Sequence, residues 1–202
     1  MSIINKILIL IVSGIGLFLN FKILGFANSF LYFTTLSNVF CFIFYLITLL
    51  LRLFKKLNKN DIYYILKGLM TLSITLTMII YYLLYFIGKI PNFYGHYFIS
   101  PLLHLITPLL VIIDYVIYGS KGNSNKKLPF AWSILLIVYT LVVIIYSFLG
   151  GTFDGDKYPY DFMNIEKYGL VKVAIVNIFL YGLFIIYGFF VQYIDKKISR
   201  NN

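Results

Sequence analysis

A threonine and a histidine lie at matching places in two strongly apolar stretches of the sequence. Thr35 comes five residues after Phe30, where one stretch begins, and His104 comes five residues after Ile99, where another begins. A hydroxyl is a poor nucleophile unless an adjacent base takes its proton, and histidine is the commonest base. If both stretches are helices that run in the same direction, the two side chains reach one level and form the nucleophile and base of an acyl-transfer site.

Two amide side chains supply the remaining parts of such a reaction. Acyl transfer develops negative charge on a carbonyl oxygen, and preplaced hydrogen-bond donors stabilise that charge. Asn38 lies three residues after Thr35 and shares its helical face, while Asn177 lies in the last apolar stretch. We expect Asn38 or Asn177 to donate to the oxyanion or to orient the histidine.

A purely structural role is the alternative for each of these polar residues. Serine and threonine in membrane helices usually bond to their own helix or pack against a neighbour. Asp114 follows His104 by ten residues and so lies about 15 Å further along a helix, too far to orient the imidazole. We expect the Asp114 carboxylate to cap a neighbouring helix or to pair with a cytoplasmic lysine.

The composition shows what kind of element must position these residues. Of the 202 residues, 61% are hydrophobic and only 12% are charged, with a mean hydropathy of +0.90. A soluble domain usually has about 25% charged residues, so this chain has too little charge to cover a surface that faces water. Cys41 is the single cysteine, which excludes a scaffold built on disulfides within the chain.

Six stretches are long enough to cross a membrane, which takes about 20 mainly apolar residues. The sequence therefore predicts an all-α polytopic membrane protein with six transmembrane helices in a single domain, residues 1–202. The predicted helices lie at about residues 7–25, 30–54, 64–87, 99–118, 128–149 and 170–194.

Charge determines the predicted orientation. With the N-terminus in the cytoplasm, most of the 17 lysine and arginine residues fall on the cytoplasmic side, as the positive-inside rule requires. Both termini are then cytoplasmic, and Thr35 and His104 lie about 7–8 Å into the outer half of the membrane. The formal net charge of +10 reflects this topology and attraction to anionic lipid, so no nucleic-acid partner is expected.

The connection at residues 150–169 is the only loop long enough to have structure of its own. Its second half, with Tyr158, Pro159 and Tyr160, is aromatic and typical of a segment at the membrane interface. It either covers a site that opens to the outer leaflet or simply anchors the chain. The sequence has no phosphate-binding GxxxxGK[ST], no HExxH and no Cys/His metal set, so we expect no metal or cofactor.

Three short segments resemble one known family. They are the stretch from Tyr32 to Asn38, the stretch from Leu103 through Pro108 to Asp114, and the stretch from Tyr158 to Met163. With six passes and short loops, the chain is similar to the androgen-induced family of membrane proteins, in particular to its bacterial six-pass branch. Animal members are atypical threonine hydrolases that cleave fatty acid esters of hydroxy fatty acids with one intramembrane threonine and one histidine.

The resemblance implies a membrane-embedded hydrolase of lipid esters in a bacterial cytoplasmic membrane. The family's threonine falls on Thr35 and its histidine on His104, while the adjacent Thr34 remains an alternative match for the nucleophile. Two other classes of function stay open: a protein that binds or transports a small lipid or ion, and a scaffold without chemistry. Broken helices and inverted repeats, which transporters often have, are not evident in the sequence.

Overall fold

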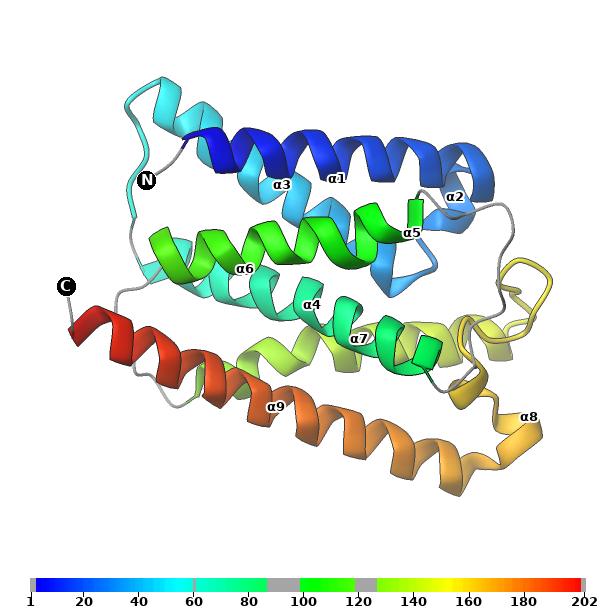
Figure 1. Cartoon of the computed structure of the whole chain (residues 1–202). Coiled ribbons are helices and arrows are strands. Elements are labelled where there is room, and N and C mark those ends of the chain that lie inside the picture. The colour runs from blue at the N-terminus through cyan, green and yellow to red at the C-terminus, as the bar shows by residue number, and fades with distance from the viewer. Residues whose placement is uncertain (1–2, 60, 87–98, 119–126, 201–202) are drawn as a thin grey trace.

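The computed structural model describes residues 3–59, 61–86, 99–118 and 127–200, and it shows a bundle of helices (Figure 1). The long helices are α1 (Ile3–Leu24), α3 (Phe33–Leu53), α4 (Asp61–Phe86), α7 (Leu128–Phe148) and α9 (Leu170–Arg200). The shorter elements are α2 (Phe26–Ser29), α5 (Ile99–Pro101), the π-helix η1 (Leu102–Ile106), α6 (Thr107–Tyr118), the 3₁₀-helix η2 (Asp161–Met163) and α8 (Ile165–Tyr168). Within these ranges, the only strand-like pairing is a single bridge between Phe153 and Asp156.

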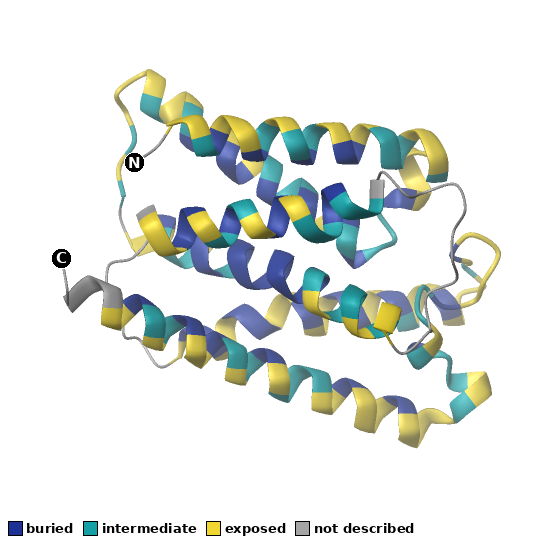
Figure 2. Cartoon of the chain, viewed as in Figure 1, coloured by how far each residue is buried: buried dark blue, intermediate teal, exposed yellow. Residues whose placement is uncertain are grey.

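Five helices are long and apolar enough to cross a membrane. They are α1, α3, α4, α7 and the part of α9 from Leu170 to Lys197. Exposed positions run along the outward faces of α1 and α9 in Figure 2, and many of them are large apolar residues such as Ile11, Phe18, Ile178 and Phe179. This pattern suits contact with lipid, and the described part of the chain is all-helical, as predicted, with five candidate membrane-spanning helices.

The remaining predicted span, residues 99–118, is helical but not uniform. It consists of α5, η1 and α6 in succession, and its apolar part, Leu102–Ile117, is shorter than the other five helices. The π-helix in its first half gives a wider turn than an α-helix, because its backbone bonds join residues five apart.

The predicted start of the second helix is three residues early. Gly25 has a positive φ of 79°, which turns the chain at the end of α1. The short helix α2 then takes up residues 26–29, and Tyr32 is extended, so α3 begins at Phe33. Elsewhere, α4 begins at Asp61, ahead of the predicted 64, and the predicted end at residue 87 lies outside the described residues.

Helix α4 lies at the centre of the bundle, where it contacts α3, α6, α7 and α9. Every residue from Met70 to Thr77 is buried (Figure 2). The four hydroxyl residues in this segment each donate to the carbonyl four residues earlier: Thr71, Ser73, Thr75 and Thr77. Their small side chains allow close helix packing, as is usual in membranes, and their hydroxyls are paired within the helix.

Gly68 should be intolerant of a larger side chain. A Cβ atom placed there would lie 2.4 Å from the Trp132 ring, which is itself fixed by a 3.1 Å hydrogen bond from Nε1 to the Ile65 carbonyl. We expect Gly68→Ala to lower the free energy of unfolding by about 1–3 kcal/mol. The matched control is Gly182→Ala in α9, where a Cβ meets nothing within 4 Å, so stability should hold or rise. Thermal unfolding of both variants in detergent compares them directly.

Candidate functional site

A threonine hydroxyl and a histidine nitrogen meet at the end of the bundle that carries α2 and α5. The Thr34 Oγ1 atom lies 3.2 Å from Nε2 of His104. Thr34 belongs to the first turn of α3, and His104 belongs to η1, so the contact joins two elements that are 70 residues apart in sequence. Both side chains are partly exposed.

The hydrogen bonds of His104 fix its tautomer. Its Nδ1 atom lies 3.0 Å from the Ser100 carbonyl oxygen, which accepts hydrogen bonds and cannot donate them. Nδ1 therefore carries the proton, and the lone pair of Nε2 points toward the Thr34 hydroxyl, as a general base requires. The imidazole also stacks on the Tyr81 ring, with centroids 3.9 Å apart. Ser100 links the two rings, because its hydroxyl donates to the Tyr81 hydroxyl.

The π-helix that positions His104 can be explained by the proline that follows it. Pro108 has no N–H group, so it cannot continue the backbone ladder. The Thr107 N–H bonds to the Leu102 carbonyl, five residues earlier, which leaves the Leu103 carbonyl without its usual helical donor. The Nδ2 group of Asn38 fills that place at 3.2 Å and also donates to the Thr34 carbonyl at 2.9 Å. One amide thus ties the helix of the hydroxyl to the helix of the base.

Three predicted site residues have partners other than those expected. The Thr35 hydroxyl accepts from Nδ2 of Asn20 at 3.1 Å, and its side chain is only 1% exposed. Because successive helical residues point about 100° apart, Thr35 faces α1 while Thr34 faces η1. The amide hydrogens of Asn38 both serve backbone carbonyls, so they are not free for an oxyanion. The Asn177 amide donates within α9, to the Val173 carbonyl at 2.8 Å, instead of to the histidine.

The loop between α7 and α9 packs against the same end of the bundle. Phe153, Tyr158 and Met163 are buried in one apolar cluster with Phe33, the residue before Thr34. Pro159 is partly buried, and the Tyr160 ring packs against this cluster. The predicted loop residues Tyr158, Pro159 and Tyr160 therefore lie beside the first turn of α3.

The Tyr160 hydroxyl interacts with Thr34. Burial raises the pKa of the Tyr160 phenol, while hydrogen bonding with Tyr139, with the backbone at Phe33 and Thr34, and with the Thr34 side chain lowers it in part. The net shift is upward from the ordinary value of 10, so the phenol keeps its proton at neutral pH. Sequence reasoning placed Tyr160 over the site but gave no role to its hydroxyl, and it missed Tyr81 and Ser100, which carry no recognisable motif.

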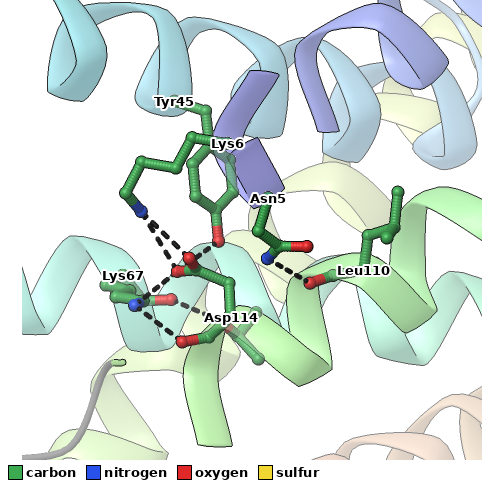
Figure 3. Close-up of polar contacts among 7 residues, drawn as sticks. Asn5, Lys6, Tyr45, Lys67, Leu110 and Asp114 are labelled. Atoms are coloured by element: carbon green, nitrogen blue, oxygen red, sulfur yellow. Dashed lines mark hydrogen bonds and ion pairs between the residues drawn. The ribbon is translucent and has the colours of Figure 1, made fainter. Parts of the chain in front are cut away.

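A second polar cluster lies toward the other end of the bundle, around Asp114 (Figure 3). Lys6 Nζ lies 3.0 Å from Asp114 Oδ1, and Lys67 Nζ lies 2.7 Å from Oδ2, with all three side chains fully buried. The Tyr45 hydroxyl donates to Oδ2 at 3.0 Å. Asp114 does pair with lysines that the positive-inside rule assigns to the cytoplasm, but those lysines are inside the bundle and not in water. Two ammonium groups share this carboxylate.

The chemistry of these clusters is that of hydroxyl, imidazole and ammonium groups. Across the described part of the chain, no three His, Cys, Asp or Glu side chains come together as a metal site would require. The cluster of Thr34, His104 and Tyr160 contains a hydroxyl hydrogen-bonded to an oriented neutral imidazole, with a phenol nearby. These groups are components of nucleophilic acyl transfer.

No known family model matches this chain, and neither do any curated proteins or solved structures.

Proposed function

We propose that this protein is an integral membrane hydrolase of lipid esters, with Thr34 as the nucleophile and His104 as the general base. The observation that carries the proposal is the 3.2 Å contact between Thr34 Oγ1 and His104 Nε2, in a histidine whose other nitrogen is bound to a carbonyl. The Thr34 hydroxyl thus contacts another element, whereas the hydroxyls of Thr71 and Thr75 in α4 bond to the carbonyl four residues earlier in their own helix.

The reaction proceeds in two stages. His104 Nε2 takes the proton of Thr34 while Oγ1 attacks the ester carbonyl, and the resulting imidazolium returns the proton to the departing alcohol. The Thr34 acyl ester is then cleaved by water, activated by the same nitrogen. The Tyr160 hydroxyl donates to the oxyanion in both stages. The ladder of α3 begins only at Leu36, which donates to the Tyr32 carbonyl, and the backbone at Phe33 and Thr34 is hydrogen-bonded to the Tyr160 hydroxyl and so helps to position it.

The surroundings of the pair favour a lipid substrate. The helices that carry Thr34 and His104 expose large apolar residues, among them Leu36 and Ile106 close to the pair. A lipid ester already dissolved in the bilayer reaches such a site without entering water. The resemblance to the androgen-induced family supports the same class of substrate and a bacterial cytoplasmic membrane.

The proposed topology has six spans, with residues 99–118 as the fourth. The two chain ends lie on the same side of the bundle (Figure 1), which an even number of spans produces. We place this side in the cytoplasm, because the basic residues gather there. The pair and the loop of residues 150–169 then lie toward the outer leaflet.

Tyr160→Phe tests the oxyanion donor. Removing one such donor usually lowers kcat by about 10²–10³-fold, so we expect a loss of that size with little change in KM. Tyr158→Phe is the matched control, since Tyr158 is buried in the same loop and its ring packs in the apolar cluster. Ester hydrolysis by the two purified variants gives the comparison, and equal activity for Tyr160→Phe and the wild type would remove Tyr160 from the mechanism.

The test of the proposed function is covalent labelling of the purified protein with a fluorophosphonate. We expect the wild type to be labelled and His104→Ala to lose the label while its helical content and thermal unfolding stay normal. Mass spectrometry of the labelled peptide should place the adduct on Thr34. A folded wild type that neither takes up label nor cleaves a panel of lipid esters contradicts the hydrolase and favours a binding or transport protein.

A further inference from the structure

A basic pocket lies at the end of the bundle opposite Thr34, where the chain passes from α3 to α4. It is open, has a volume of about 330 Å³, and is lined by Arg52, Lys55, Leu57 and Lys59. A water molecule occupies about 30 Å³ of liquid, so the pocket admits a much larger group. Three of its four lining side chains are cationic, so these walls present positive charge to an occupant.

The buried cluster around Asp114 adds to the positive charge at this pocket. Lys6 interacts electrostatically with both Arg52 and Lys59, and Lys67 interacts with Lys59. Lys6 and Lys67 share the single carboxylate of Asp114, so the cluster has one positive charge in excess when all three groups are ionised. Charges in a low-dielectric interior are poorly screened, and an anion in the pocket offsets their repulsion of the lining cations.

Lys55 occupies a backbone position that ordinarily favours a smaller residue. Its φ is 56°, in the left-handed region that glycine and asparagine adopt most readily at the end of a helix. The Lys56 N–H donates to the Leu51 carbonyl at 2.7 Å, which closes α3 just at this point. A lysine at this helix end interacts favourably with the helix dipole, and Lys55 also lines the pocket.

We propose that this pocket binds the phosphate group of an anionic phospholipid at the membrane face that carries the chain termini. Lysine and arginine are the side chains that proteins use for phosphate, and basic segments beside a membrane attract anionic lipids. Leu57 offers an apolar contact for the glycerol and the first part of the acyl chains. The pocket is separate from the Thr34–His104 pair, so the proposed lipid binding does not depend on whether that pair is catalytic.

The experiment compares two double variants that remove equal charge from the same end of the bundle. Lys55→Asn with Lys59→Gln alters the pocket, and asparagine keeps the left-handed backbone at residue 55. Lys56→Asn with Lys196→Gln is the control, because both lysines are exposed and neither lines the pocket. Native mass spectrometry in neutral detergent then measures the affinity of each protein for dioleoyl phosphatidic acid, with phosphatidylcholine as the zwitterionic reference.

Each lining cation should contribute about fivefold to affinity, so the pocket variant is expected to bind phosphatidic acid about 25-fold more weakly than the wild type. The control should stay within about twofold. Inorganic phosphate serves as the soluble competitor: displacement of the lipid at millimolar phosphate identifies the phosphate alone as the ligand, and no displacement identifies the phospholipid. Equal losses in the two double variants, or a wild type that does not prefer phosphatidic acid over phosphatidylcholine, would overturn the proposal.

Discussion

Replacing Thr34 with alanine is expected to reduce kcat/KM for ester hydrolysis by about 10³-fold or more, whereas Thr35→Ala should retain most of the activity. Loss of a hydroxyl nucleophile removes the covalent route, and the activity that remains in such enzymes comes from binding and oxyanion stabilisation. Thr34 has the contact with His104 and is partly exposed. Thr35 is buried and accepts from Asn20, so its loss affects only the packing of α1 on α3.

Two further variants separate chemistry from folding. Thr34→Ser keeps a hydroxyl in the same place and should preserve measurable hydrolysis, while Thr34→Val keeps the shape without the hydroxyl and should behave like alanine. Steady-state rates with a lipid ester in mixed micelles provide the measurement. If Thr35→Ala abolishes hydrolysis in a folded protein and Thr34→Ala does not, the assignment of the nucleophile is reversed.

Replacing Asp114 with asparagine is expected to lower the free energy of unfolding by about 3–5 kcal/mol. The substitution leaves the ammonium groups of Lys6 and Lys67 buried without a counter-charge, and breaking one side of a buried ion pair has a cost of this size. Unfolding by titration with a denaturing detergent, followed by circular dichroism, measures the loss. Lys196→Gln, which removes an exposed charge at the end of α9, should change stability by less than about 0.5 kcal/mol.

A combined variant tests the physical reason for this loss. Replacing Lys6 and Lys67 with methionine, Asp114 with leucine and Tyr45 with phenylalanine removes the whole polar cluster at nearly constant volume. Buried ion pairs are often replaced by apolar residues without loss of stability, so this variant should recover most of what Asp114→Asn loses. A combined variant no more stable than Asp114→Asn would show that packing around the cluster, and not unpaired charge, sets the cost.

The fold was predictable where length and composition decide it. The five long helices lie close to apolar stretches of the sequence, because an apolar segment of that length with so few charges has few alternatives to a membrane helix. The start of α3 was predicted too early, because hydropathy does not register the turn at Gly25 or the extended backbone of Tyr32. The limits of an apolar stretch in the sequence therefore do not give the limits of the helix.

The candidate site was predictable only to the level of depth along the helices. Counting residues from the predicted helix starts brought Thr35 and His104 to one level, whereas the structure joins the adjacent Thr34 to His104 and Thr35 to Asn20. The choice between two adjacent threonines depends on rotation about the helix axis. The π-helix alters the rotation of the residues beyond it, and that bulge results from Pro108 together with Asn38 of another helix. Counting residues along one helix cannot reveal a contribution from a side chain of another helix.

The burial of Lys6 and Lys67 could not be predicted from the sequence either, because it too depends on residues of other helices. Lys6 and Lys67 each lie near the end of an apolar stretch, where lysine normally reaches water. Their burial depends on Asp114, which lies on a third segment, and on the Tyr45 hydroxyl from a fourth. A charge count along the chain determines topology but does not show that four helices converge on one carboxylate.

The two hydrogen bonds of the Asn38 amide have a mechanical consequence. Helices in a bilayer tilt and slide as the thickness of the hydrocarbon changes. The Asn38 side chain holds the carbonyl of Thr34 on its own helix and the carbonyl of Leu103, the residue before the histidine. We therefore expect a shift of α3 along its axis to carry the imidazole with the hydroxyl, so that the distance between Thr34 Oγ1 and His104 Nε2 depends little on the thickness of the surrounding membrane.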